Sequence, residues 1–358
     1  MPDGNCAIPN AFRVDNVPSF VRRVSRTRTT TSYYYLLCST SSSLMEKGNN
    51  VVLHDDLYYY CAHSFFLSYT TLLLFLFAGA IREVDHTPQV MQALSDPTMT
   101  VVLQTAPSVR VTIAEMFGGQ PGQCSEGQLV GAAKAAGFRN VFDTNVAADL
   151  TILEEAHELL HRIEIAKQGS PQEQAAKPLP MFTSCCPGWV NLVEQSYPHL
   201  IPHLSTCRSP MSMLSSIIRH DWWPRQTHIL RQHGTKQSSK VVTLQYNEHE
   251  RRLAASSVTA DQSKLFVVAV MPCTAKKDEI ARSQFRMKEN GLPETNAVLT
   301  VREFARILEL RGVARRDSLE SFMNLPELVY DNPFGESTGA AILFGVTGGV
   351  MEGTSLVV

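Results

Sequence analysis

From residue 99 onward, short apolar runs alternate with amphipathic segments. The apolar runs cover residues 101–104, 141–142, 265–271 and 297–299, and Val, Leu and Phe dominate them. The run 265–271 is apolar throughout, which is typical of a central strand of a parallel sheet. Because strands that alternate with helices favour parallel sheets flanked by helices, we expect an α/β fold.

Pairs of polar residues mark where the helices begin. Three pairs have the spacing of a capping box: Ser125 with Gln128, Thr151 with Glu154, and Thr300 with Glu303. They predict helices that end near Gly137, at about Glu164 and at Gly312. A fourth helix is expected to begin at Pro187, because proline suits the first position of a helix.

Residues 1–78 differ from the rest of the chain in composition and in hydrophobic periodicity. Seven of the ten tyrosines precede residue 70, Ser/Thr tracts lie between them, and no helical or strand period is sustained. The apolar run from Phe65 to Ala80 is interrupted by Ser and Thr and is shorter than the roughly 18 to 20 apolar residues of a spanning helix. We therefore predict an atypical segment, disordered or wrongly assigned as coding sequence, and no membrane span.

Composition narrows the class of protein. A net charge of -2 with 18% charged residues gives no sign of a nucleic-acid partner. The eight cysteines are scattered and form no C-x-x-C pair, which argues against a small secreted disulfide scaffold and favours a reducing compartment. The polar, irregular stretch 220–262 predicts an inserted surface loop, in which Trp222-Trp223 serve packing.

The most informative feature is the doublet Cys185-Cys186, which follows the apolar residues 180–182 and precedes the helix at Pro187. Thiols near the amides of a helix N-terminus are favoured as thiolates, and therefore as metal ligands or reactive groups. Consecutive side chains cannot easily both face one metal centre, so two different roles are expected. The alternative is one buried packing cysteine beside one incidental cysteine.

Three loops with unusual residues each follow an apolar strand: Thr105-Ala106-Pro107, Ser184-Cys185-Cys186 and Pro272-Cys273. Open α/β sheets place their ligand sites at the carboxyl ends of the strands. A thiolate at Cys273 with Lys276 three residues later also suits an anionic ligand. We therefore expect the three loops to form one site.

In the helix predicted over 151–164, Glu155, Glu158 and Arg162 are spaced i, i+3 and i+7 and align along one stripe. The apolar stripe is made by Ile152, Leu153, Ala156, Leu159, Leu160 and Ile163. One interpretation of the charged stripe is a solvated face with an intrahelical ion pair. The other is a series of titratable groups that passes protons between solvent and a buried site.

Taken together, the segments Thr105–Arg110, Thr183–Trp189 and Met271–Lys277 strongly resemble the catalytic domain of iron-only (FeFe) hydrogenases. The resemblance runs from about Gly79 to Gly353, interrupted by the insertion. It implies two lobes with parallel sheets flanked by helices and an active site between the lobes. It also implies an H-cluster, which is a 4Fe-4S cluster bridged to a two-iron subsite, and the reversible reduction of protons to hydrogen with electrons from a ferredoxin-type donor.

The resemblance implies a role for each candidate site residue. Cys186 and Cys273 would ligate the 4Fe-4S cluster. Cys185 would be the proton donor, and the path would continue through Glu155, Ser205 and Glu158 to Arg162 near solvent, which favours the proton-path interpretation of the stripe. The residues expected to line the two-iron subsite are Ala106, Pro107, Ser108, Ser209, Pro210, Lys276, Phe344 and Gly345, with Lys276 holding a cyanide.

The chain also departs from the family pattern. The other two cluster cysteines of the family lie in a C-terminal segment of the form Glu-x-Met-Ala-Cys-x-x-Gly-Cys, which this chain lacks up to Val358, and Cys124 and Cys207 do not match those positions. Met211-Ser212 stands where the family often has paired glutamines. We therefore expect residues 79–98 to be a remnant of a ferredoxin-like linker, and residues 99–358 to be an incomplete catalytic domain, from a truncated or mis-spliced gene.

Two other functions remain open. One is a hydrogenase-related scaffold of cytosolic iron–sulfur assembly, similar to the prelamin-A-recognition-factor group. The other is an inactive fragment. Cys185 favours the enzyme, because the assembly relatives generally lack the first cysteine. For the enzyme we expect hydrogenase maturation factors as partners and a reducing, low-oxygen compartment, either the cytoplasm or an organelle such as a chloroplast or hydrogenosome.

Overall fold

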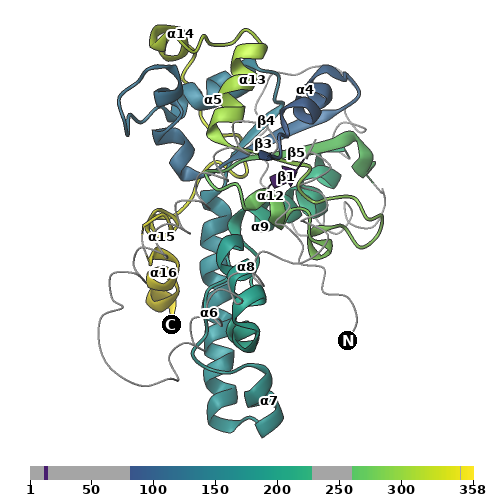
Figure 1. Cartoon of the computed structure of the whole chain (residues 1–358), viewed down its shortest axis with the longest axis vertical. Helices are drawn as coiled ribbons and strands as arrows, with labels where there is room; N and C mark the ends of the chain where they lie inside the picture. Colours follow the sequence, from purple (N-terminus) through teal and green to yellow (C-terminus); the bar gives the residue numbers. More distant parts are fainter. Residues whose placement is uncertain (1–11, 15–80, 228–259, 347) are drawn as a thin grey trace, which may run out of the picture. The chain divides into compact units, whose positions relative to one another are not determined.

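The computed structural model describes residues 12–14, 81–227, 260–346 and 348–358 (Figure 1). The chain divides into two compact units, Met1–Val84 and Asp85–Val358. In the first unit, strand β1 (Phe12–Val14) pairs antiparallel with β2 (Ile81–Glu83). Apart from β1, the atypical segment 1–78 lies outside the described residues, as does the part 228–259 of the predicted insertion.

The second unit alternates strands and helices. Its strands are β3 (Thr100–Thr105), β4 (Asn140–Asp143), β5 (Leu265–Val270) and β6 (Ala297–Leu299). Its α-helices are α4 (Thr87–Ser95), α5 (Glu126–Ala135), α6 (Asn145–Gln168), α7 (Pro171–Ala176), α8 (Pro187–Ser196), α9 (Pro210–Ile217), α12 (Lys276–Glu279), α13 (Val301–Leu310), α14 (Leu319–Met323), α15 (Gly339–Phe344) and α16 (Gly349–Val357). Short 3-10 segments are η1 (Pro107–Val111), η2 (Ala114–Phe117), η3 (Pro198–His203), η5 (Gln262–Lys264) and η6 (Ser283–Phe285), and η4 (Ile218–Trp222) is a π-helical turn after α9.

The four strands form one parallel sheet in the order β4-β3-β5-β6. All four strands predicted from apolar runs are confirmed, and β5 is central, as its continuous apolar sequence predicts. In the register of the sheet, Leu103 lies between Val141 and Val268. The α/β class is therefore confirmed.

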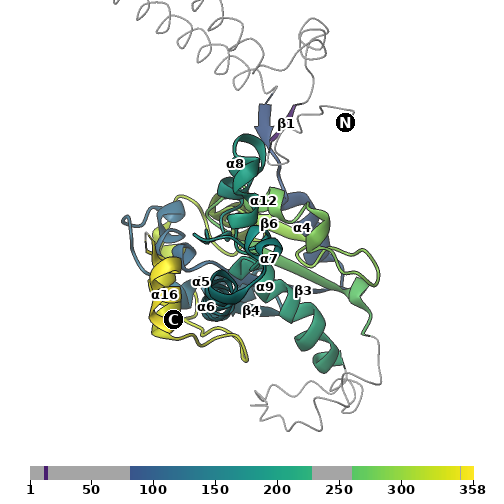
Figure 2. The ribbon, with the colours of Figure 1, turned by 90° about the horizontal axis from the view of Figure 1, so that it is seen from below.

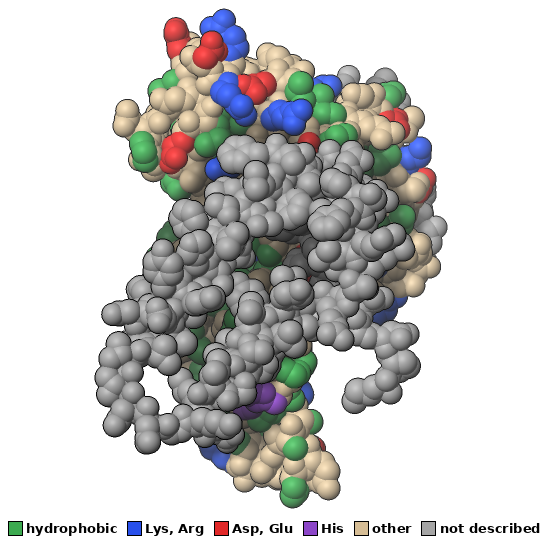
Figure 3. Space-filling model, in the orientation of Figure 1, with side chains coloured by type: hydrophobic (Ala, Val, Ile, Leu, Met, Phe, Trp, Pro, Cys, Tyr) green, Lys and Arg blue, Asp and Glu red, His purple; other side chains and the backbone are tan. Residues whose placement is uncertain are grey.

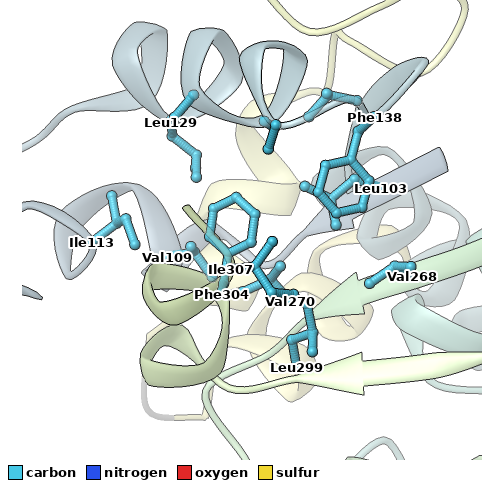
Figure 4. Packing of buried hydrophobic residues seen from close by; sticks show 14 of the residues in the cluster. Leu103, Val109, Ile113, Leu129, Phe138, Val268, Val270, Leu299, Phe304 and Ile307 are labelled. Carbon is cyan, nitrogen blue, oxygen red and sulfur yellow. The ribbon is translucent and has the colours of Figure 1, made fainter. Parts of the chain in front are cut away.

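Alternate residues of the central strands point to opposite faces of the sheet and reach two separate cores. On one face, Leu103, Val268 and Val270 pack with Leu129 of α5 and Phe304 of α13 (Figure 4). This cluster holds α4, α5 and α13 against the sheet. The first compact unit ends at Val84, before α4 and within the predicted linker 79–98.

On the other face, Val102 and Val267 pack with Leu214 of α9 and with Trp222 and Trp223. Both tryptophans are buried, which confirms that they serve packing. This second core attaches the start of α6, together with α9 and the π-helical turn, to the sheet. The helices α6 and α9 are therefore fixed to the face opposite α5 and α13.

The helix α6 runs from the sheet into a helical lobe, where α9, α15 and α16 pack against it (Figures 1 and 2). We expected parallel sheets in both lobes. In the described residues of the helical lobe, parallel pairing is limited to a single bridge between Phe182 and Leu204. The predicted strand at 180–182 is reduced to that bridge.

The three predicted capping boxes differ in outcome. Thr300 and Glu303 form both reciprocal hydrogen bonds, so this capping box is confirmed. Ser125 is the N-cap of α5, but its hydroxyl donates to the carbonyl of Arg110 and no capping box forms. The prediction for Thr151 is wrong, because α6 begins six residues earlier and the Thr151 hydroxyl donates to the Ala147 carbonyl at 2.9 Å.

Two observations concern the apolar character of the helices and the charges on the surface. None of the helices within the described ranges has the combined length and apolar character needed to cross a bilayer. On the face drawn in Figure 3, acidic and basic side chains are interspersed over the sheet lobe. That mixture matches the small net charge of the sequence.

Candidate functional site

Two of the predicted loops meet at the carboxyl edge of the sheet. The Ala106 amide, just after β3, donates to the Val270 carbonyl at the end of β5 at 3.0 Å. Pro107 then opens η1, and Cys273 follows β5 with an exposed thiol. The two loops therefore lie next to each other, as expected, because β3 and β5 are neighbouring strands of the sheet.

The cysteine doublet lies at the start of α8 in the helical lobe. Cys186 is the N-cap of this helix and exposes its thiol, whereas Cys185 is partly buried. Just before the doublet, the Ser205 amide donates to the Phe182 carbonyl at 2.7 Å, and the Ser184 hydroxyl donates to the Cys207 carbonyl at 3.1 Å. The helix start predicted at Pro187 is confirmed, and Ser205 is brought beside the doublet.

Lys276 joins the doublet to the Cys273 loop. Its ammonium donates to the Cys185 carbonyl at 2.9 Å and to Glu279 Oε2 at 2.6 Å. Its backbone amide donates to the Cys273 carbonyl at 3.2 Å. One lysine therefore connects the predicted proton donor with the loop of the second predicted cluster ligand.

Glu155 lies behind the doublet and is completely buried. Among the described residues, neither of its carboxylate oxygens has a hydrogen-bond partner of good geometry. Burial raises the pKa of Glu155 to about 7, and the charge of Glu158 adds to the effect. The Ser184 amide and the Ser205 hydroxyl lower the pKa, but they do not offset the burial. Glu155 can therefore bind or release a proton near neutral pH.

Glu158 has the opposite environment. Its Oε2 accepts from the Ser205 hydroxyl at 2.9 Å and from the amide and hydroxyl of Thr206 at 2.9 and 3.1 Å. Its Oε1 accepts from Nη2 and Nε of Arg162 at 2.7 and 3.0 Å. Burial alone would raise the pKa of Glu158, but these hydrogen bonds outweigh it and lower the pKa.

The expectation that Arg162 lies near solvent is wrong. Only 1% of Arg162 is exposed, and its guanidinium also donates to the carbonyls of Pro178, Pro202 and Leu204. Because the main chain supplies acceptors deep in the lobe, the side chain is drawn inward. The interpretation of the stripe as a solvated face is wrong for the same reason, whereas the apolar Leu153 and Leu160 are exposed.

Glu158 rather than Arg162 lies at the surface end of the stripe. It lines an open pocket of about 600 Å³ together with Glu154, His157, His161 and Lys177. Glu158 is 9% exposed, so its contact with solvent is small but direct. A proton leaving the buried site along this stripe would reach water here.

Two thiols near Glu155 are held protonated. Burial raises the pKa of Cys185 to about 11, although Lys276 acts in the opposite direction. Burial likewise raises the pKa of Cys207 to about 12. Cys207 lines the open pocket and a second pocket of about 330 Å³ that also contains Ser184, Ser205, Ser209 and Glu279. Neither Cys207 nor Glu279 was among the residues predicted for the site; Lys276 three residues before Glu279 is a weak signal for an ion pair.

The residues predicted to line a two-iron subsite are distributed over both lobes. The Ser108 hydroxyl is buried, and no described residue forms a hydrogen bond with it. Ser209 caps α9, and Pro210 begins it. Phe344 and Gly345 end α15, which packs on α6, and in the described part of the chain no hydrogen bond links these two residues to the three loops.

The donor set is suited to iron bound through sulfur. Cys186 and Cys273 present exposed thiols, and the orphaned Ser108 hydroxyl and the Lys276 ammonium supply polar contacts for an anionic group. Across the described ranges, no group of three or more His, Cys, Asp or Glu side chains could hold a metal ion. The chemistry of the two exposed thiols is compatible with iron–sulfur ligation.

Comparisons with known proteins agree with this chemistry. Residues 99–244 and 251–357 match the family "iron only hydrogenase large subunit, C-terminal domain". The NADP-reducing hydrogenase subunit HndD of Solidesulfovibrio fructosivorans is 36% identical over 76% of this chain, and the chain spans 39% of that protein. The cytosolic iron-sulfur assembly component 3 of Bos taurus is 30% identical over 62% of this chain, and the aligned part covers 39% of that protein.

The fold is also similar to that of solved structures. A variant of apo FeFe-hydrogenase HydA1 from Chlamydomonas reinhardtii superposes with a TM-score of 0.54 and 36% identity, over 75% of this chain and 56% of that chain. The parallel sheet and its flanking helices are therefore those of a hydrogenase catalytic domain, although the chain spans only part of each relative.

Proposed function

Because the chain belongs to the family of iron-only hydrogenases, we propose that it carries out the reversible reduction of protons to hydrogen with electrons from a ferredoxin-type carrier. The observation that supports this proposal is the buried Glu155 behind the doublet, followed by the hydrogen-bonded pair Ser205 and Glu158. A buried carboxyl group with a pKa near neutrality is suited to carry protons, which hydrogen chemistry requires.

The proposed cofactor is an H-cluster. Cys186 and Cys273 would contribute two of the four ligands that a 4Fe-4S cluster normally takes. Lys276 and Ser108 would face its two-iron subsite, and Lys276 would bind an anionic ligand there. When bound, the cofactor supplies the iron at which protons and electrons combine.

The residues of the chain would supply the protons. From the open pocket, a proton binds Glu158, and the Ser205 hydroxyl then donates its own proton toward Glu155 as it accepts one from Glu158 at 2.9 Å. The Cys185 thiol would give up its own proton on the cofactor side, and Glu155 would then return a proton to the Cys185 sulfur. Each step exchanges one proton for another, so no group gains net charge beyond the single proton in transit.

Glu158 and Glu155 would have different roles in proton transfer. Glu158 has a lowered pKa and releases its proton quickly, whereas Glu155 has a pKa near 7 and holds the proton beside Cys185 at neutral pH. Catalysis is fastest when the proton carrier has a pKa near the working pH. The resting proton would therefore sit at the buried end of the path.

The assembly relatives supply the competing function, and one experiment separates the two. The chain is expressed anaerobically with hydrogenase maturation factors, its iron is counted, and hydrogen evolution is measured with reduced ferredoxin. Iron with hydrogen evolution is expected. Iron without hydrogen evolution would favour the assembly role, and a chain that binds no iron would contradict both functions.

A further inference from the structure

A buried carboxylate outside the proton path connects the site to a neighbouring helix. Glu279 lies at the end of α12 and is only 4% exposed. Its Oε1 accepts from the hydroxyls of Ser209 and Ser212, each at 2.5 Å. Its Oε2 accepts from the Lys276 ammonium at 2.6 Å. Among the described residues, two hydroxyls and one ammonium therefore donate hydrogen bonds to this carboxylate.

The two serines fix the orientation of the carboxylate. Ser209 is the N-cap of α9, and both serine side chains are buried. The hydroxyls bind one oxygen, so the other oxygen is left facing Lys276. Charge-assisted hydrogen bonds of this kind are short and strong, as the distances indicate.

Lys276 needs such a constraint. A lysine side chain has a flexible four-carbon stem, and its ammonium can take many positions unless a partner holds it. Here the ammonium is held between Glu279 Oε2 and the Cys185 carbonyl at 2.9 Å. Without Glu279, the Lys276 ammonium would keep only the Cys185 carbonyl as an acceptor. The Lys276 side chain is 12% exposed, so it could then turn toward solvent.

We propose that Glu279, oriented by Ser209 and Ser212, is the positioning residue that holds the Lys276 ammonium at the cysteine doublet. It acts through Lys276 and not on the reacting atoms. The inference rests on the proposed function to the extent that Lys276 faces the anionic ligands of the cofactor. The geometry of the network itself is a property of the metal-free chain.

The sharpest variant is Glu279→Gln. The amide keeps the size of the side chain, and its oxygen still accepts from both serine hydroxyls. Its NH₂ group would then face the ammonium, so that a donor meets a donor. The ion pair is lost without a cavity.

A neighbouring ion pair gives the matched control. Lys277, the next residue of α12, donates to Glu303 at 2.8 Å, and this pair faces α13 instead of the doublet. Glu303→Gln therefore removes a comparable buried ion pair from the same helix. It leaves the contacts of Lys276 with Glu279 and Cys185 intact.

The test measures the rate at which an amine-acylating reagent labels Lys276 in the metal-free chain, by mass spectrometry. Glu279→Gln should raise the labelling rate of Lys276 by about tenfold, the factor expected for loss of one charge-assisted hydrogen bond. Ser212→Ala, which removes one hydroxyl without touching the ion pair, should give a smaller rise. Glu303→Gln should leave the labelling of Lys276 unchanged.

The same variants are then loaded with cofactor, and the infrared bands of the cyanide ligands are recorded. A shift in Glu279→Gln that is absent in Glu303→Gln supports the positioning role. Unchanged labelling of Lys276 in both Glu279→Gln and Ser212→Ala would overturn it, and Ser212→Ala decides the matter if Glu279→Gln does not fold. Raised labelling in a chain that evolves no hydrogen would uphold the positioning role and contradict only the proposed function.

Discussion

Glu155 and Glu158 lie one turn apart on the buried face of α6, and their surroundings move their pKa values in opposite directions. Glu155 is buried without a hydrogen-bond partner of good geometry, whereas Glu158 accepts five hydrogen bonds. Both residues lie on the same face of α6, so the opposite pKa shifts come from their different hydrogen-bond partners. This contrast leads to separate predictions for the two residues.

The first prediction concerns stability and Glu155. Its pKa in the fold is about 7, above the ordinary value of 4.5, so the folded chain binds the proton more tightly than the unfolded chain. The stability that this protonation contributes is complete below pH 4.5 and is lost as the pH rises through 7. Glu155→Gln should therefore raise the free energy of unfolding by up to about 3 kcal/mol at pH 8 and by little at pH 4.5. Denaturant unfolding at both pH values measures this, and an equal effect at both would contradict the assignment.

Glu158→Gln should have the opposite effect on stability. Its pKa is lowered in the fold, so ionised Glu158 stabilises the fold above the ordinary pKa, and this stability is lost as the pH falls through the lowered value. The amide would leave the buried Arg162 without a charged partner, which costs about 3 kcal/mol. The loss should appear in denaturant unfolding at pH 7, and a variant as stable as the native chain would show that the carbonyl partners of Arg162 are sufficient.

A third prediction separates the two protonated thiols. Cys185→Ala should lower hydrogen evolution by at least about 100-fold while iron content is retained, because it removes the last proton carrier. Cys207→Ala is the control, since Cys207 is a partly buried thiol of the same site that the proposed path does not use. It should keep activity within a small factor. Equal losses in the two variants would point to general damage to the site.

A fourth prediction tests the sheet lobe. A Cβ at Gly131 in α5 would lie 1.9 Å from the Pro326 carbonyl oxygen, and neither backbone can yield easily. Gly131→Ala should therefore lower the free energy of unfolding by about 3 kcal/mol. Gly339→Ala, where a Cβ would meet nothing within 4 Å, should change it by less than about 0.5 kcal/mol. Comparable losses in both variants would contradict the close approach of α5 to residue 326.

Local signals predict the strands and several helix starts. The uninterrupted apolar run at β5 and the capping box at Thr300 are both confirmed, because each depends on residues that are close in sequence. Thr151 misled the prediction of α6, since its hydroxyl finds a carbonyl within the helix instead of a free amide. Pattern alone does not distinguish these two uses of a threonine.

The site could be predicted in part. The resemblance assigned Glu155, Ser205 and Glu158 to one path, and the structure brings these three together. The buried state of Arg162 and the network of Glu279 could not be predicted, because the Pro202 carbonyl and the Ser209 hydroxyl that bind them lie 40 and 70 residues away in sequence. Exposed leucines opposite a buried charged stripe also reverse the usual pattern of an amphipathic helix.

The most direct test of the proposed proton path compares two adjacent carboxyl groups. Glu155 is buried behind the doublet, whereas its neighbour Glu154 is exposed in the open pocket. Hydrogen evolution is measured at pH 7 for chains loaded with equal iron. Glu155→Gln should reduce turnover by at least about 100-fold, the usual contribution of a positioned proton carrier, and Glu154→Gln should retain native turnover. Native turnover in Glu155→Gln would contradict the path.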